Sequence, residues 1–139
     1  MTESAENVER LNEVGLADFS DRRDEAAPVV MLNLLAFKPD GGRERYERYG
    51  EAVAPLLAGV GGRILYAGRP APAMIGAGSW DLVLLVEYPS RAAFLEMIGS
   101  PAYQEIAHLR TEALARGELH PVDPLDGDFT GVSAAGFAG

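Results

Sequence analysis

Arg110 is the residue whose position in the sequence most strongly suggests chemistry. With Tyr103 at zero on a helical projection, Arg110 falls at about 340°, in the middle of an apolar face. A guanidinium there needs a partner, because an isolated charge is very costly to bury. The partner could be the carboxylate or enolate of a small ligand, an internal carboxylate such as Asp81, or water at the rim. The sequence therefore predicts an anion pocket or an internal ion pair around Arg110.

Three tyrosines and one asparagine could complete such a pocket. Tyr46 and Tyr49 lie on the apolar face of another predicted helix, and a buried phenol also needs a hydrogen-bond partner. Helix-to-sheet packing could bring them together with Tyr103 and Arg110. Asn33 is the lone polar residue in an apolar strand, where its amide could donate to a ligand carbonyl. Alternatively, that amide bonds to backbone, to another side chain or to water. The predicted ligand is a small anionic or carbonyl compound.

Two further candidates adjoin at the start of a predicted strand. Trp80 and Asp81 must point to opposite faces of that strand, so Trp80 could wall a pocket while Asp81 acts as a base. The alternative is a core tryptophan beside a paired acid at the strand end. The two histidines are weaker candidates, because His108 projects at about 140° from Tyr103, away from the apolar face. His120 falls at an edge, and neither histidine has metal-ligand spacing, so we expect no metal site.

Other catalytic signatures are missing from the sequence. The glycines at 59–62 lack the lysine and hydroxyl of a phosphate loop, and there is neither a dinucleotide fingerprint nor a nucleophile elbow. The absence of cysteine removes disulfides and thiolate sites. We therefore expect no cofactor.

Charge and composition narrow the classes of partner. With 21 acidic and 12 basic residues the formal net charge is −9, which argues against nucleic acid and anionic membranes as partners. The first 24 residues are polar, and no apolar run has the length of a membrane span. We expect a cytoplasmic protein with no membrane partner.

The elements that would position the candidate residues follow from hydrophobic periodicity. The apolar run Val29 to Phe37 predicts a strand buried on both faces, and a 3.6-residue period from Arg43 predicts an amphipathic helix that ends at Gly59. The remaining elements are strands over 63–69, 80–88 and 118–122, and a helix from Ser90 to Arg116 that Gly99 interrupts before Ser100 and Pro101 restart it.

This order, β-α-β-β-α-β, predicts an α+β fold of the ferredoxin-like type with an antiparallel sheet. We expect this domain to span residues 28–122, after an N-terminal extension (1–27) with a short helix from Ser4 to Val14, and before a flexible acidic tail (123–139). The first and third strands are apolar on both faces, so the face without helices needs a cover. A second copy of the chain is the simplest cover, which predicts a homodimer.

A series of short motifs supports this architecture. They are VMLNLLAF (30–37), YERY (46–49), the glycine pair 61–62, WD (80–81), YPS (88–90) and SPAY (100–103), with Arg110 beyond them. Their order and spacing resemble family 1330 of the domains of unknown function, over about residues 28–120. The resemblance implies a dimeric α/β barrel in which two four-stranded sheets face each other with the helices outside. It implies no agreed activity, since the wider superfamily includes cofactor-independent oxygenases, small isomerases and cyclases, and haem proteins.

Three functions stay open on the sequence. One is a cofactor-free enzyme in which Arg110 orients an anion, Asn33 polarises a carbonyl and a tyrosine shuttles a proton. Another is a non-enzymatic ligand-binding or interaction module whose dimer is the functional unit. The third is a haem protein, which is the least favoured because His108 points away from the core.

Overall fold

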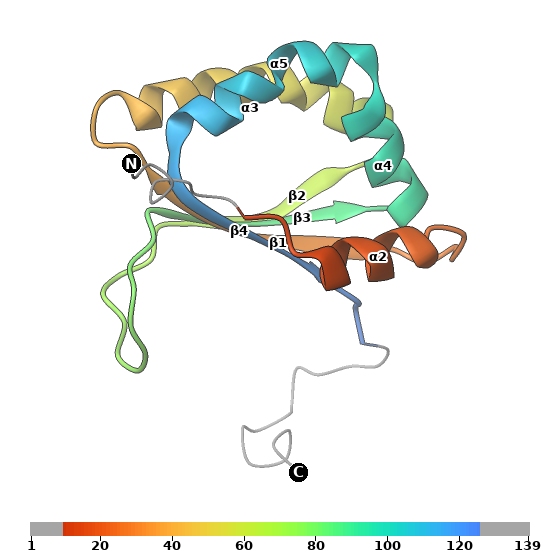
Figure 1. Cartoon of the computed structure of the whole chain (residues 1–139), viewed down its shortest axis with the longest axis horizontal. Helices are drawn as coiled ribbons and strands as arrows, with labels where there is room; N and C mark the ends of the chain where they lie inside the picture. Colours follow the sequence, from red (N-terminus) through yellow and green to blue (C-terminus); the bar gives the residue numbers. More distant parts are fainter. Residues whose placement is uncertain (1–9, 126–139) are drawn as a thin grey trace.

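The computed structural model (Figure 1) describes residues 10–125 and contains one sheet with two long helices across one face. It confirms the predicted α+β, ferredoxin-like fold. The elements are α2 (Glu13–Asp21), β1 (Val29–Phe37), α3 (Gly42–Gly59), β2 (Arg63–Gly68), β3 (Leu82–Tyr88), α4 (Arg91–Gly99), α5 (Pro101–Ala113) and β4 (Leu114–Val122).

The sheet has the strand order β2-β3-β1-β4, and every neighbouring pair is antiparallel. The apolar strand β1 lies in the interior, where it pairs with β3 on one side and β4 on the other. We predicted that this strand is buried on both faces, but within one chain Val29, Met31 and Leu35 are buried whereas Val30, Leu32 and Leu34 on the other face are only partly covered. The core between sheet and helices includes Val29, Met31, Val86 and Met97.

The predicted interruption between α4 and α5 is confirmed. Ser90 caps α4 by accepting a hydrogen bond from the backbone N–H of Ala93 at 3.1 Å. Ser100 caps α5 in the same way, accepting from Tyr103 at 3.2 Å, and Pro101 occupies the first turn. Because proline lacks an N–H, it suits a helix start, where that group has no partner within the helix. The break turns α5 so that it can lie against α3.

The last strand is longer than predicted. We expected helix to about residue 116 and strand from 118, but α5 ends at Ala113 and β4 begins at Leu114. Leu114 pairs with Phe37, and β4 stays beside β1 as far as Val122. Pairing with β1 supplies backbone hydrogen bonds that the local sequence does not reveal, so the helix ends at Ala113, before the predicted end at about Arg116.

The N-terminal helix also differs from the prediction, which placed it over Ser4–Val14. Residues before 10 lie outside the described residues, and the described helix, α2, covers Glu13–Asp21. Asn12 caps it by accepting a backbone hydrogen bond at 3.0 Å. Phe19 then packs edge-on against Phe94 of α4, with 5.4 Å between ring centroids. This tertiary contact stabilises helix in a segment whose own apolar stripe is thin.

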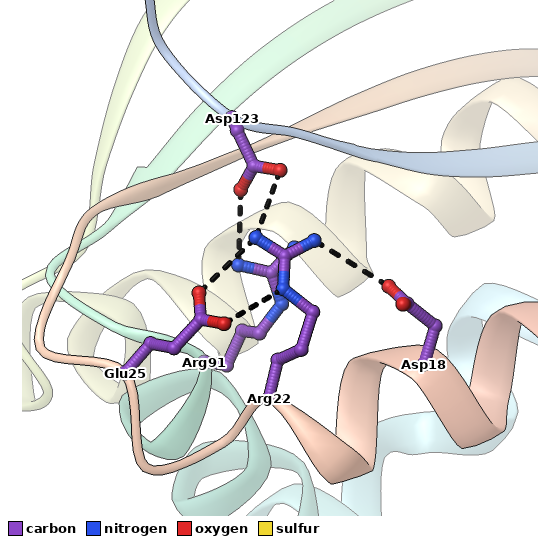
Figure 2. Close-up of polar contacts among 5 residues, drawn as sticks. All are labelled: Asp18, Arg22, Glu25, Arg91 and Asp123. Carbon is purple, nitrogen blue, oxygen red and sulfur yellow. Dashed lines mark hydrogen bonds and ion pairs between the residues drawn. The ribbon is translucent and has the colours of Figure 1, made fainter.

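The predicted flexible tail starts at Asp123, which the structure shows in ion pairs. One oxygen of its carboxylate, Oδ2, lies 3.0 Å from Nη2 of Arg22, and the other, Oδ1, lies 3.1 Å from Nη1 of Arg91 (Figure 2). Arg22 also pairs with Glu25 and Asp18. The cluster therefore joins the end of α2, the start of α4 and the chain beyond β4. Residues 126–139, the rest of the predicted tail, lie outside the described residues.

Candidate functional site

A cavity of about 740 Å³ lies between the sheet and the helix layer. Its floor comes from alternate residues of β1 and β3, including Met31, Leu84 and Val86. Its roof comes from α3, α4 and α5, with Phe94 among the apolar contributors. The cavity exists because both layers present apolar side chains inward, while the break before α5 holds that helix across the sheet.

The structure brings five of the predicted residues together around this cavity. Asn33 belongs to β1, Tyr46 and Tyr49 belong to α3, and Tyr103 and Arg110 belong to α5. They are up to 77 residues apart in sequence. Among the described lining residues, Arg110 is the only arginine or lysine. The arrangement combines mostly apolar walls with a small group of polar atoms, which is the usual character of a small-molecule site.

Asn33, on the floor of the cavity, contacts Arg110 of α5. Nη2 of Arg110 donates to Oδ1 of Asn33 at 3.4 Å, and Nδ2 of Asn33 donates to the carbonyl of Met31 at 3.3 Å. Asn33 is 8% exposed, so a polar side chain there needs these partners. With this orientation the amide oxygen faces Arg110 and the amide nitrogen faces the backbone. Donation from Asn33 to a ligand carbonyl would require the amide to turn.

Tyr46, Tyr49 and Tyr103 form a connected aromatic group on the helix side of the cavity. The hydroxyl oxygens of Tyr49 and Tyr103 are 2.9 Å apart, and the rings of Tyr46 and Tyr49 have centroids 5.5 Å apart. Burial is the main cause that raises the pKa of Tyr49, and the neighbouring Tyr103 raises it further, whereas Arg110 acts in the opposite direction. Tyr49 is therefore a neutral phenol at physiological pH. It can donate a hydrogen bond, but it is not a general base.

Tyr88 is a cavity residue that the sequence analysis missed. It ends β3, shares its face with Leu84 and Val86, and lines the cavity. Burial also raises the pKa of Tyr88, with Tyr103 as the next cause. The two-residue alternation of β3 could have found it, because Tyr88 follows the apolar residues of that face at the same spacing. We used Tyr88 only as part of the motif YPS, which marks the turn after the strand.

Trp80 and Asp81 do not line the cavity. Both lie just before β3, where the Asp81 carboxylate accepts a hydrogen bond from the backbone N–H of Phe37 at 2.8 Å. The guanidinium of Arg116 stacks over the Trp80 ring, 4.4 Å from its centroid. These contacts correspond to the structural alternative for Asp81, a paired acid at a strand end, and both residues lie at the N-terminal end of β3.

The histidines lie outside the cavity as well. His108 is exposed on α5, as its helical phase predicts, and Nε2 of His120 is 2.8 Å from a carboxylate oxygen of Glu118. Within residues 10–125, no three histidine, aspartate or glutamate side chains are grouped so that they could hold a metal ion. In the same part of the chain, no helix is both long and apolar enough to cross a bilayer.

Comparison with protein families matches residues 41–120 to a domain of unknown function, DUF1330. The chain is also similar to RPA0582, a protein of unknown function from Rhodopseudomonas palustris, whose crystal structure superimposes with a TM-score of 0.78. The two sequences are 34% identical, over 88% of this chain and 97% of the other. No curated protein matches the chain significantly.

Two more distant crystal structures are of dimeric proteins. One is a protein of unknown function with a ferredoxin-like fold from Bacteroides fragilis, with 14% identity, a TM-score of 0.50, and coverage of 70% of this chain and 96% of the other. The second is a ferredoxin-like protein of unknown function from Thermobifida fusca, with 13% identity, a TM-score of 0.51, and coverage of 72% and 93%. At such low identity the likeness shows the fold alone.

Proposed function

The chain belongs to the DUF1330 family, and we propose that it binds a small organic molecule with an apolar body and a carboxylate or carbonyl group. The observation that carries this proposal is the cavity of about 740 Å³ with Arg110 and the tyrosines on its walls. Small-molecule sites commonly have volumes of roughly 300 to 1,000 Å³ and a few converging polar groups in apolar surroundings.

The polar groups favour an acceptor-rich ligand. The guanidinium of Arg110 has the planar fork that matches a carboxylate, and it lies in the cavity wall beside Asn33. In the Tyr49–Tyr103 pair one hydroxyl donates to the other, so the pair keeps one O–H that can donate to a carbonyl or carboxylate oxygen. Met31, Leu84 and Phe94 would surround the apolar part of the ligand.

An enzyme acting on a carbonyl compound is the second candidate, and the tyrosine pair is what favours it. A phenol that donates to a carbonyl oxygen also stabilises the enolate that forms when a neighbouring carbon loses its proton. The raised pKa of Tyr49 restricts it to this donor role. A base would have to come from another group or from the ligand itself, so binding is the function that the geometry supports best.

A calorimetric titration with 4-phenylbutanoate tests the binding function, with 4-phenylbutanamide as the uncharged control. We expect saturable binding of the acid, and affinity at least about tenfold lower in Arg110→Met, because one charge-assisted hydrogen bond is worth about 1.5 to 3 kcal/mol. Arg48→Met removes an exposed arginine of α3 outside the cavity and should leave the affinity unchanged. Equal affinity in wild type and Arg110→Met would contradict the assignment of Arg110.

We also propose that the chain forms a homodimer through the sheet face opposite α3 and α5, called the open face. Met31, Asn33 and Leu84 line the cavity, so strand alternation directs their neighbours to the other side. The apolar part of the open face comprises Val30, Leu32, Leu34, Val83 and Leu85, each partly exposed, and the register places Glu87, Glu118 and His120 beside them. An apolar surface of this kind favours a partner. The two dimeric structural neighbours support a second copy of the chain as that partner.

Sedimentation velocity at micromolar concentration tests the dimer. We expect wild type to sediment as a dimer and Leu32→Lys to sediment as a monomer, because the charge would be buried in the centre of the interface. Ala92→Lys, at an exposed position of α4, is the matched control and should remain dimeric. A monomeric wild type would contradict the proposal.

A further inference from the structure

The connection between β2 and β3, residues 69–81, forms a protruding arm. Figure 1 shows it leaving one end of the sheet and extending beyond the sheet on the side opposite α3 and α5. Met74 and Ile75 lie toward its outer end, and their side chains are 99% and 96% exposed. Two adjacent large apolar side chains with almost no contact to their own chain gain stability wherever another surface removes them from water.

Asp81 fixes one side of the base of this arm. Its backbone N–H donates to the carbonyl of Leu35 at 2.7 Å, and its carboxylate accepts from the N–H of Phe37 at 2.8 Å. Both partners belong to the end of β1. Asp81 therefore continues the pairing of the sheet by one residue and ties the part of the arm that leads into β3 to β1, one of the two inner strands.

Arg116 of the edge strand β4 holds the same part of the arm, the residues just before Asp81. Its Nη2 donates to the backbone carbonyl of Ser79, and its guanidinium stacks on the ring of Trp80 at 4.4 Å. Cation–π stacking of this kind is favourable even at a partly exposed site. The contacts of Trp80, Asp81 and Arg116 thus explain why these residues lie outside the cavity: they hold the base of the arm and leave its outer part clear of the body.

Two glycines lie in the part of the arm that follows Met74 and Ile75. Gly76 and Gly78 have φ angles of 107° and 94°, a region that other residues rarely adopt. A Cβ at either position would meet nothing within 4 Å, so backbone conformation rather than crowding requires glycine there. The direction of the arm is therefore encoded in its own backbone as well as in its base.

Charge indicates what kind of surface the arm meets. Residues 70–80 contain no charged side chain, in a chain with 24% charged residues and a net charge of −9. Two copies of such a chain repel each other wherever acidic surfaces meet. An uncharged arm with an apolar tip avoids that repulsion, and it points to the side of the sheet on which the open face lies.

We propose that the arm grips a second copy of this chain, with Met74 and Ile75 buried against the partner at the margin of the interface between the two open faces. The proposal rests on the homodimer proposed above. Because a two-fold axis makes each contact occur twice, the two copies exchange arms reciprocally. Four apolar side chains are then removed from water per dimer, and the arms fix how the two sheets are oriented.

A change of the tip tests the energetic part of this proposal. We expect Met74→Asp combined with Ile75→Asp to raise the dimer dissociation constant by about tenfold or more in sedimentation equilibrium, since each copy loses apolar burial and gains charge. Both positions are fully exposed within one chain, so the variant should keep the fold, which circular dichroism checks. Ala92→Asp combined with Ala102→Asp adds the same charge to exposed helix positions and should not change the constant.

The outcomes separate the arm from the dimer. A dimeric wild type with an unchanged dissociation constant in the arm variant would overturn the arm contact and leave the homodimer standing. A wild type that is monomeric at all concentrations would overturn both. Equal weakening by the arm variant and the helix control would show a general charge effect and would also overturn the arm contact.

Photocrosslinking tests the location of the arm directly. The sequence has no cysteine, so Met74→Cys provides a single thiol for a benzophenone maleimide. We expect irradiation to join two copies, and a mixture of isotopically labelled and unlabelled chains should show crosslinks between them. Glu51→Cys, at an exposed position of α3, carries the same label as a control and should give no dimer. Crosslinks from Met74→Cys found only within its own chain would contradict arm exchange.

Discussion

Tyr49 of α3 and Tyr103 of α5 share a hydrogen bond with 2.9 Å between their hydroxyl oxygens, although 54 residues separate them in the chain. Their rings meet edge to face, with 6.2 Å between centroids. The bond connects the two helices above the cavity and orients both hydroxyl groups toward each other. One hydroxyl donates and the other accepts, so each phenol has a hydrogen-bond partner in surroundings that are otherwise mostly apolar.

We expect this pair to be energetically coupled. Tyr49→Phe and Tyr103→Phe should each lower the free energy of unfolding by about 1 kcal/mol, because each leaves one hydroxyl without its partner. The double variant should cost less than the sum, with a coupling of about 0.5 to 1 kcal/mol. Urea unfolding of the four proteins gives this cycle. Strictly additive losses would contradict the coupling.

Asn33→Asp should weaken ligand binding. The new carboxylate would lie at the oxygen that Arg110 now contacts at 3.4 Å, so it would pair with the guanidinium and repel an anionic ligand. We expect the affinity for 4-phenylbutanoate to fall about tenfold or more, corresponding to roughly 1.4 kcal/mol. The affinity for 4-phenylbutanamide should change little. Calorimetric titration of both compounds measures the difference, and equal losses would show that the effect is not electrostatic.

Alkaline pH should destabilise the protein through its buried tyrosines. Burial raises the pKa of Tyr49 and Tyr88 above the value of about 10 for an unfolded chain. The unfolded state therefore loses these protons first, so their stabilisation is complete below about pH 10 and declines as the pH rises further. Each tyrosine contributes a slope of up to about 1.4 kcal/mol per pH unit. Urea midpoints across this range should fall less steeply in Tyr49→Phe, and an unchanged slope would contradict this cause.

The ion pairs of Asp123 should contribute measurably to stability. Arg91 is 2% exposed, so Asp123→Asn removes the anion that faces a buried guanidinium. We expect a loss of about 1 to 2 kcal/mol, less than for a fully buried pair because Asp123 is half exposed. Asp18→Asn, which removes only the exposed pair with Arg22, is the control and should change stability by less than about 0.5 kcal/mol.

The pH dependence of this cluster has the opposite sign to that of the tyrosines. The hydrogen bond from Arg22 is the main cause that lowers the pKa of Asp123, and Arg91 adds to it. The stabilisation is therefore present above the unfolded carboxyl pKa of about 4 and is lost as the pH falls below it. Acid unfolding monitored by circular dichroism should be less pH-dependent in Asp123→Asn than in wild type. An identical acid profile would contradict this contribution.

The sequence by itself determined the features that depend on neighbouring residues. The apolar run of β1, the 3.6-residue period of α3 and the serine caps before α4 and α5 are local signals, and the structure confirms each element. The same periodicity placed Arg110 and Tyr49 on the inner faces of their helices. Helical phase depends on spacing alone, so these directions could be predicted before any contact was known.

Only the tertiary structure decided the features that depend on distant pairing. The start of β4 at Leu114 depends on Phe37, and the position of Asp81 depends on a backbone group of the same strand. The hydrogen bond between Tyr49 and Tyr103, and the cavity beside it, depend on how two helices cross one sheet. Helical phase and strand alternation predict which side chains face the core. The partners of these side chains, and the space between them, follow from packing, which couples residues far apart in the chain.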